Sequence, residues 1–306
     1  MTRAIFTTSA ALIAFAANSI LCRMALADGD MDALSFSLVR LASGALFLAL
    51  LVYLLAHKTG KPATHEEQKK GYGNWLSALM LMLYVEAFSL AYLSLSAATG
   101  ALILFAAVQF TMLGGALYQG KNPSLAEWLG MLLAMAGLSY LLLPGLNSPP
   151  LTGAILMLVS GIAWGIYSLR GGGSNPLEHT SGNFGRALIL SLPLLLVLLL
   201  PSEIWGELPF TRVHINTQGL LLAACSGALA SGLGYALWYS ALQILRASQA
   251  AIVQLSVPVI TAFAGVLLLQ EPITERLIVA SIFILGGIFV ALRVSKAKSD
   301  QSPYQA

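Results

Sequence analysis

Residues 234–292 decide the fold, and they read GYALWYSALQILRASQAAIVQLSVPVITAFAGVLLLQEPITERLIVASIFILGGIFVAL. Two long apolar runs, Ala247–Leu269 and Leu277–Leu292, are separated only by the short polar turn Gln270–Thr274. About 20 apolar helical residues cross a hydrocarbon core about 30 Å thick. The stretch therefore predicts two antiparallel transmembrane helices joined by a tight turn.

The composition of the whole chain favours the same environment. Of its 306 residues 58% are hydrophobic and only 9% are charged, whereas a soluble domain carries about 25% charged residues. The net charge of +3 gives no argument for nucleic-acid binding. Cys22 and Cys225 lie in separate apolar runs, so we expect buried thiols rather than a disulfide or a metal site.

An imperfect copy of the opening stretch occurs at residues 91–142, with the same order of apolar run, polar turn and apolar run. At an offset of 150 residues, Ala101 matches Ala251 and Gly137 matches Gly287. The match is weak at single residues, but its order predicts a duplicated membrane unit.

Apolar runs of spanning length predict an all-α integral membrane protein with ten transmembrane helices, because a chain in lipid must satisfy its own backbone hydrogen bonds. The runs are 4–26, 34–56, 75–96, 98–119, 125–143, 151–169, 184–200, 218–242, 247–269 and 276–294. The first run continues to Leu26 and has a counterpart at Gly153–Leu169, so we expect a retained helix and not a cleaved signal peptide.

The spans divide into two halves, residues 1–146 and 150–298, followed by a short tail at 299–306. Each half holds five spans, an odd number, so the second half is expected to be inverted relative to the first, as in many secondary transporters. With both termini in the cytoplasm, twelve basic residues face inside and four face outside, as the positive-inside rule requires. The inside set is Arg3, Lys58, Lys61, Lys69, Lys70, Lys121, Arg170, Arg186, Arg246, Arg293, Lys296 and Lys298, and the outside set is Arg23, Arg40, Arg212 and Arg276.

These features resemble a known family. The five-plus-five arrangement, the Phe-x-x-x-Arg opening of the second span at residues 36–40, and the run SQAAIVQLSVPVITAFAGVLLLQEPIT at 248–274 are similar to the EamA-type branch of the drug/metabolite transporter superfamily. The best local motif is a helix with Pro258 followed by a turn with Glu271, where the first half has Val108 and Lys121. The resemblance covers nearly the whole chain and implies a carrier. Members mostly export amino acids, other metabolites or drugs, and relatives import sugars, so the cargo stays open.

Glu86 is the first candidate for a functional role. It follows Tyr84 near the centre of the third span and is the only acidic residue deep within an apolar run. A charged carboxylate at the bilayer centre costs about 2.5 kcal/mol or more, so such residues usually face the bundle interior. Glu86 is expected to couple protons or to pair with a substrate ammonium, and the structural alternative is a neutral carboxyl group bonded to a neighbouring helix.

Aromatic residues gather on two later spans. Tyr235, Trp238 and Tyr239 lie at i, i+3 and i+4 on the eighth span, and Trp164 and Tyr167 lie three apart on the sixth. Such faces can hold an apolar or cationic substrate by stacking or cation–π contact. Packing and interface anchoring are the structural alternatives.

Polar groups within other spans are further candidates. Asn18, Gln109, Gln249 and Gln254 can bind a substrate or another helix. Arg40 opens the second span and can bind a carboxylate with its forked guanidinium group, or extend to the lipid headgroups. Pro258 removes a backbone hydrogen bond within the ninth span and is expected to act as a hinge.

The rival class is a membrane enzyme, but all four histidines are in loops and neither a His-Glu-x-x-His nor a Gly-x-Ser-x-Gly motif occurs. The sequence therefore predicts a non-enzymatic secondary transporter of the inner membrane, as a monomer or a homodimer. Its partners are expected to be a small-molecule substrate and the lipid bilayer, with no cofactor, metal or nucleic acid. The function that the sequence favours is proton-coupled export of a small amino-acid-like or amphipathic metabolite. The alternatives are import of a metabolite, lipid flipping and a role other than transport.

Overall fold

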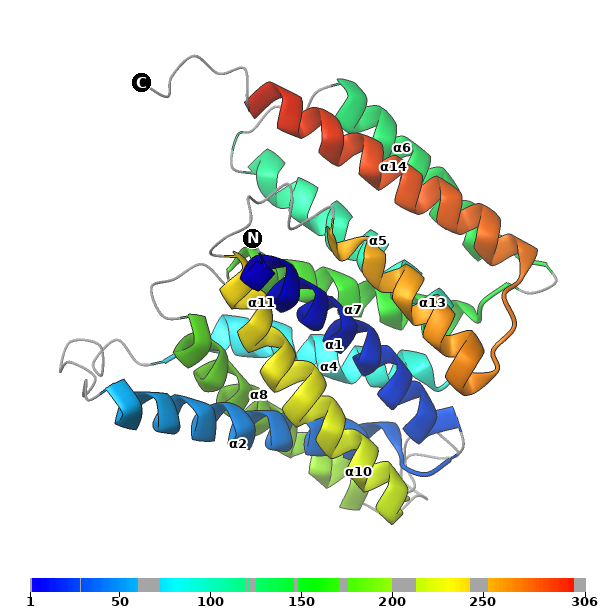
Figure 1. Ribbon diagram of the computed structural model, residues 1–306. Coiled ribbons are helices and arrows are strands. Elements are labelled where there is room, and N and C mark those ends of the chain that lie inside the picture. Colours follow the sequence, from blue (N-terminus) through cyan, green and yellow to red (C-terminus); the bar gives the residue numbers. More distant parts are fainter. Residues whose placement is uncertain are drawn as a thin grey trace, which may run out of the picture.

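Nearly all of the described backbone is helical in the computed structural model (Figure 1). The structure describes residues 2–27, 29–59, 72–118, 120, 125–145, 148–170, 176–199, 213–242 and 253–299. Within these ranges the one extended pairing is an isolated bridge between Met31 and Ile215. The predicted all-α class is confirmed.

The described helices form ten rods. They are α1 (Thr2–Ala27), α2 (Ala33–Thr59), α4 (Trp75–Tyr92), α5 (Ala97–Tyr118), α6 (Leu125–Leu142), α7 (Leu151–Leu169), α8 (Pro176–Leu199), a composite of α10 (Thr217–Cys225), η1 (Ser226–Leu233) and α11 (Gly234–Leu242), α13 (Ser256–Leu269) and α14 (Glu275–Ser299). The segment η1 is π-helical, a conformation that is rare and often marks functional sites.

Two predicted boundaries are wrong. The third span ends at Tyr92 instead of residue 96, because Ser96 caps the next helix by accepting a hydrogen bond from the Thr99 amide at 3.3 Å. The seventh begins at Pro176 instead of residue 184, since Pro is well suited to the first helical turn even where the following residues are polar. The first residues of the predicted ninth span, 247–252, lie outside the described part, as do Gln249 and Lys121.

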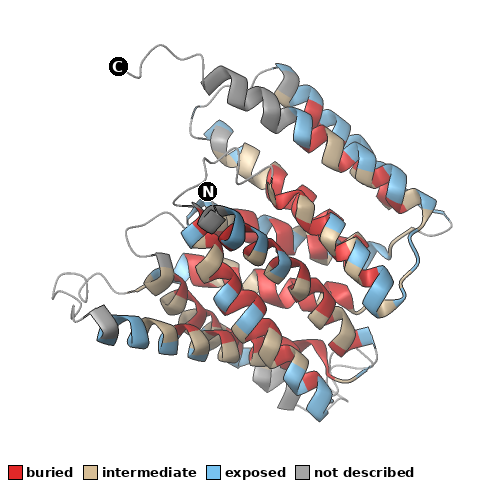
Figure 2. Ribbon diagram, in the orientation of Figure 1, coloured by how far each residue is buried: buried red, intermediate tan, exposed pale blue. Residues whose placement is uncertain are grey.

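Six of these helices are long and apolar enough to cross a membrane: Ile5–Ala27, Ala33–His57, Trp75–Tyr92, Ala97–Gly115, Leu151–Leu169 and Thr217–Ala241. Shorter apolar stretches occupy Glu127–Leu142 and Ser256–Leu269. Buried residues follow the central helices, whereas the outer faces carry exposed apolar side chains such as Phe263, Leu268 and Ile282 (Figure 2). An apolar exterior of this extent suits lipid and not water.

The rods run roughly along one direction, and α1 begins at the end of the bundle where α14 finishes (Figure 1). In the centre, α1 packs against α10, η1 and α11, while α7 packs against α4 and α5. Helices α2 and α8 close one side. The pair α6 and α14 lies at the opposite edge, next to α5 (Figure 1).

Helix α2 and the π-helical segment approach each other backbone to backbone. A Cβ atom added to Gly227 would collide with the Arg40 carbonyl oxygen and the Ser43 hydroxyl. A Cβ on Gly44 would lie 2.5 Å from the Phe184 ring and 3.1 Å from the Gly227 carbonyl. Small residues commonly allow such close contact between membrane helices.

Gly227→Ala is therefore expected to lower the stability of the folded protein by about 1–3 kcal/mol through overpacking. The midpoint of thermal unfolding of the purified protein in detergent measures this effect. Gly286→Ala is the matched control, because nothing lies within 4 Å of the added Cβ there. Equal midpoints for the two variants would contradict the close contact.

Candidate functional site

A cavity lies at the centre of the bundle, enclosed by α1, α4, α5, α7 and α11. Its aromatic walls are Phe15, Tyr84, Phe88, Phe105, Trp164 and Tyr235. Leu104 and the polar residues Asn18 and Ser19 complete the lining. The space is about 10 Å³, room for about one water molecule. In this conformation the cavity is too small to hold a metabolite.

The aromatic rings that line the cavity contact one another edge to face or at tilted angles. The ring centroid of Trp164 lies 4.9 Å from Tyr84, 4.9 Å from Tyr235 and 6.1 Å from Phe15. Phe15 lies 5.6 Å from Trp238, which is behind the cavity on α11. Rings from α1, α4, α7 and α11 thus hold four rods together at one point, as aromatic pairs of this geometry favour.

Arg40 reaches the wall of this cavity from α2. Its side chain has no exposed surface, so the structure does not place it at the headgroups. The guanidinium donates from Nε to the Ser231 hydroxyl at 3.1 Å and from Nη2 to the Tyr84 hydroxyl at 2.9 Å. The Cζ atom of the guanidinium lies over both aromatic rings, 5.2 Å from the centroid of Tyr84 and 5.0 Å from the centroid of Phe88. The remaining nitrogen, Nη1, has no hydrogen-bond partner among the described residues.

Asn18 connects α1 to the π-helical segment. The Ser226 hydroxyl donates to Asn18 Oδ1 at 2.7 Å, and Asn18 Nδ2 donates to the Ser231 hydroxyl at 3.2 Å. Since Ser231 also accepts from Arg40, three elements share one chain of buried hydrogen bonds. Asn18 therefore both binds another helix and lines the cavity.

Glu86 is buried but does not line the cavity. It lies two residues from Tyr84, on the side of α4 that faces α2 and α8, beside Ser37 and Ser191. Its side chain is 7% exposed, and neither carboxyl oxygen has a partner of hydrogen-bond geometry in the described part of the chain. The structure thus separates the predicted coupling residue from the aromatic centre.

Of the other predicted residues, three are buried within the bundle and one lines a separate groove. Gln109 on α5 and Gln254 near the start of α13 are buried, and Gln109 Nε2 has no described partner. Tyr167 is fully buried and stacks on Trp164 at 5.5 Å. Tyr239, in contrast, lines a separate groove between α2, α8 and α11. The predicted aromatic stripe is therefore divided, with Tyr235 in the cavity and Tyr239 outside it.

An ion pair that the sequence did not predict closes the end of the bundle where α1 terminates. Arg23 Nε lies 3.0 Å from Glu271 Oε1, and Arg23 Nη1 donates to the Tyr92 carbonyl at 2.9 Å. Glu271 Oε2 accepts from the Ala97 amide at 2.7 Å, at the first turn of α5. These contacts join α1, α4, α5 and the α13–α14 turn, and we call them the Arg23–Glu271 latch.

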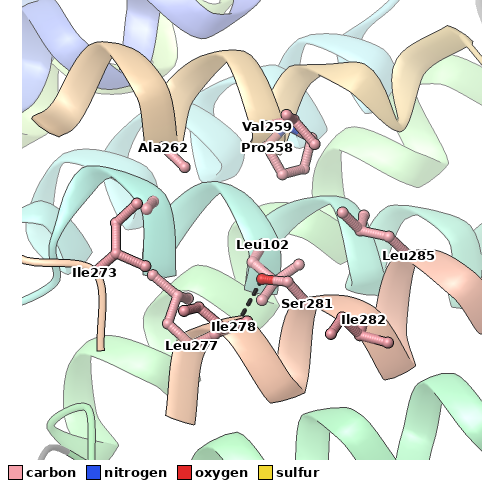
Figure 3. Close-up of a pocket in the computed structure, with 11 residues that line it drawn as sticks. Leu102, Pro258, Val259, Ala262, Ile273, Leu277, Ile278, Ser281, Ile282 and Leu285 are labelled. Atoms are coloured by element: carbon pink, nitrogen blue, oxygen red, sulfur yellow. Dashed lines mark hydrogen bonds between the residues drawn. The ribbon is translucent and has the colours of Figure 1, made fainter. Parts of the chain in front are cut away.

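A larger space lies outside the centre, in a groove between α5, α13 and α14 (Figure 3). Its lining is apolar, from Leu102 and Pro258 to Ile282, and the Ser281 hydroxyl is bonded back to the Leu277 carbonyl at 2.6 Å. This chemistry suits acyl chains or helix packing and offers nothing to a polar cargo. The predicted hinge Pro258 lies on this groove and is buried.

The described residues offer no group of three or more His, Cys, Asp or Glu side chains that could hold a metal ion. Both cysteines are free thiols.

Comparisons with known proteins agree with a membrane carrier. Residues 151–293 match the EamA-like transporter family. An uncharacterized protein of Pseudomonas aeruginosa is 50% identical over 95% of this chain and 94% of its own length. Uncharacterized transporters of Archaeoglobus fulgidus and of Bacillus subtilis (YoaV) are 27% and 23% identical, over 65% and 85% of this chain and 69% and 87% of their own lengths.

A protein of known crystal structure shares the fold, with a TM-score of 0.57 and 19% identity over 94% of this chain and 99% of that chain. The match to the family over the second half, and relatives named as transporters that extend into the first, agree with the apolar helical structure. The chain is a multi-pass membrane protein that belongs to the EamA-like transporter family of the drug/metabolite transporter superfamily.

Proposed function

We propose that the protein is a secondary transporter of the inner membrane that exports a small metabolite by alternating access around the central aromatic cavity. The observation that carries this proposal is the cavity itself: a small aromatic space at the centre of the bundle, built from helices of both halves of the sequence. Binding sites between repeats near the bilayer midplane are typical of secondary transporters. Export is proposed because members of the family that the chain resembles mostly export their cargo.

The proposal includes an inverted repeat of five spans in each half, and the contacts between the helices support it. In this repeat, α1, α4 and α5 of the first half correspond to α7, the α10–α11 rod and α13 of the second half. Helix α1 packs against α11 and α13, and its counterpart α7 packs in the same way against α4 and α5. Helix α2 corresponds to α8, and α6 corresponds to α14, and the two members of each of these pairs pack against each other. A contact pattern with this symmetry is expected of two halves related by a twofold axis.

The helix caps repeat in the same way. Asn74 caps α4 by accepting from the Ser77 amide at 2.8 Å, and Asn216 caps α10 by accepting from the Gly219 amide at 2.7 Å. In the proposed topology these two caps lie on opposite faces of the membrane. Both termini are proposed to be cytoplasmic, as the distribution of Lys and Arg favours.

Two features distinguish the ends of the bundle. In the proposed topology the Arg23–Glu271 latch lies at the outer face. At the inner face, Arg170 caps the C-terminal end of α7, whereas Arg23 lies four residues before the end of α1. Arg170 donates to the neutral Ser77 hydroxyl and to the Asn74 side chain, both at 3.3 Å. We infer that an ion pair holds the outer end closed, whereas the inner end is held by neutral hydrogen bonds.

Glu86 is proposed to couple transport to protons from its position between α2, α4 and α8. Buried carboxyl groups inside membrane bundles commonly carry protons or ions. Because Glu86 lies outside the cavity lining, proton binding and cargo binding would use separate places on the same helix, α4.

Glu86→Gln is expected to abolish export while the protein stays folded, because the amide keeps the size of the side chain but cannot bind and release a proton. Untargeted metabolite profiling of the medium, with cells that overproduce equal amounts of each variant, measures the effect. The matched control is Glu275→Gln, since this carboxyl group is exposed at the start of α14.

A compound that accumulates with the wild type and Glu275→Gln but not with Glu86→Gln would support both export and coupling. Equal accumulation with Glu86→Gln would remove this residue from the mechanism. No accumulation above that of control cells would contradict export.

Arg23→Gln and Glu271→Gln are each expected to open the outer end and to expose Cys22, which is fully buried one residue before Arg23. In a Cys225→Ser background, the rate at which a membrane-impermeant maleimide labels Cys22 on intact cells measures this opening. We expect an increase of about tenfold, because removing one partner of a partly buried pair leaves the other unpaired.

The double variant should label no faster than the faster single variant, since the two residues act through one contact. Arg276→Gln serves as the control, because Arg276 lies at the same end but stacks on Tyr140 and makes no contact in the latch. Unchanged labelling in both single variants, or additive effects in the double variant, would rule out the latch.

A further inference from the structure

We infer that the cargo is an organic anion, a carboxylate on a flat apolar body, whose negative charge is attracted by Arg40 at the wall of the central cavity. The inference rests on the proposed function, because it names the chemical class that the transporter would move.

The first argument is that the charge of Arg40 has no directly bonded counter-ion among the described residues. The side chain has no exposed surface, and its two bonded partners, Ser231 and Tyr84, are neutral. No described carboxylate lies within ion-pair distance of Arg40, and Glu86 on α4 interacts with its charge only at longer range. A buried cation that no carboxylate contacts directly is unfavourable inside a membrane protein, and residues of this kind usually lie on a substrate or ion pathway.

The second argument is the position of this charge beside the cavity. The guanidinium lies over the faces of Tyr84 and Phe88, and both rings line the cavity. Through Ser231 it is linked to Asn18, which also lines the cavity. Arg40 is therefore one side chain away from any cargo between these walls.

The third argument is that unpaired donors converge at the same place. Arg40 Nη1 is buried without a described hydrogen-bond partner, and the buried Tyr235 hydroxyl, which makes no hydrogen bond of good geometry, lies next to the Tyr84 hydroxyl. The Tyr84 hydroxyl accepts from Arg40, which leaves its own hydrogen to donate. Buried donors that lack acceptors are costly and call for an explanation. A carboxylate would accept from all three, and Arg–carboxylate bonds are among the strongest hydrogen bonds in proteins.

The remaining walls define the rest of the cargo. Phe15, Phe105 and Trp164 offer faces and edges of rings and suit a flat apolar group. None of the described residues that line the cavity is acidic, and Glu86 lies beside Ser37 and Ser191, outside this lining. An ammonium group would find no carboxylate here, so a net anion fits the site better than a cation or a zwitterion does.

Binding by compounds that differ only in their charged group tests this inference. Isothermal titration would measure the affinity of the purified full-length protein in lipid nanodiscs for three sets: benzoate, benzylamine and benzyl alcohol; hexanoate, hexylamine and hexanol; indole-3-acetate, tryptamine and tryptophol. At least one carboxylate should bind tenfold or more tightly than its amine and alcohol counterparts. A result in which no carboxylate is preferred would overturn the inference.

Arg40→Gln should remove the preference for the carboxylate while the alcohol binds as before. Because this change also alters contacts with Ser231 and Tyr84, Tyr235→Phe is the second variant: it removes one donor and keeps the ring. It should weaken carboxylate binding about three- to tenfold and leave alcohol binding unchanged. Tyr53→Phe is the control, since Tyr53 is 61% exposed on the outer face of α2. Equal weakening of both ligands by Tyr235→Phe, or no weakening of either, would contradict the inference.

The failure of this inference can be told apart from the failure of the proposed function. Export that depends on Glu86 but moves a neutral or cationic compound would overturn the anion assignment and leave transport standing. Anion binding that depends on Arg40 and Tyr235, without accumulation of any compound in the medium, would support the site and contradict export.

Discussion

The burial of Arg40 is the constraint on which the arrangement of the bundle depends. A guanidinium inside lipid must be surrounded by protein, and here three elements supply that surrounding. Helix α4 provides the Tyr84 hydroxyl and two ring faces, η1 provides Ser231, and α2 carries the residue itself. The glycines that bring η1 against the backbone of α2 make this contact short enough. Removing any of these partners would leave a charge in an apolar interior.

The two halves contribute similar helices but different chemistry. The cavity takes Phe15 and Tyr84 from the first half and Trp164 and Tyr235 from the second. The buried cation comes from the first half alone, and the latch acid Glu271 comes from the second alone. In the mechanism that we propose, these differences let two similar halves bind an asymmetric cargo and hold the two ends of the bundle closed with different interactions.

The sequence was sufficient for the helices and for part of the site. Long apolar runs predicted the rods, and the positions of Tyr84, Trp164 and Tyr235 predicted three walls of the cavity. The sequence could not predict which neighbouring helices Glu86 faces, because α4 is apolar on all sides. Residues two positions apart along a helix differ by about 200° in direction, so Glu86 and Tyr84 point to different sides of α4. Phe15 and Phe105 were missed since a phenylalanine in an apolar span carries no signal of its own. The latch was missed because Arg23 and Glu271 are 248 residues apart.

The π-helical segment shows the same limit. Its sequence, SGALASGL, is rich in small residues that permit close packing, but nothing in it predicts the change in helical winding. That winding lets Ser226 and Ser231 both reach Asn18, although residues five apart do not face one side of a regular α-helix. The local sequence favours a helix at this position, and the contacts with α1 and α2 favour the π-helical over the α-helical form.

The most direct test of the account is whether the central cavity opens to each side of the membrane in turn. Ser19→Cys, in a protein without Cys22 and Cys225, places one thiol in the cavity lining. Labelling by an impermeant maleimide would be measured in right-side-out and in inside-out vesicles. The account predicts labelling in both preparations, with an Arg23→Gln variant labelled faster from outside. Labelling from one side only, or from neither, would contradict alternating access around this cavity.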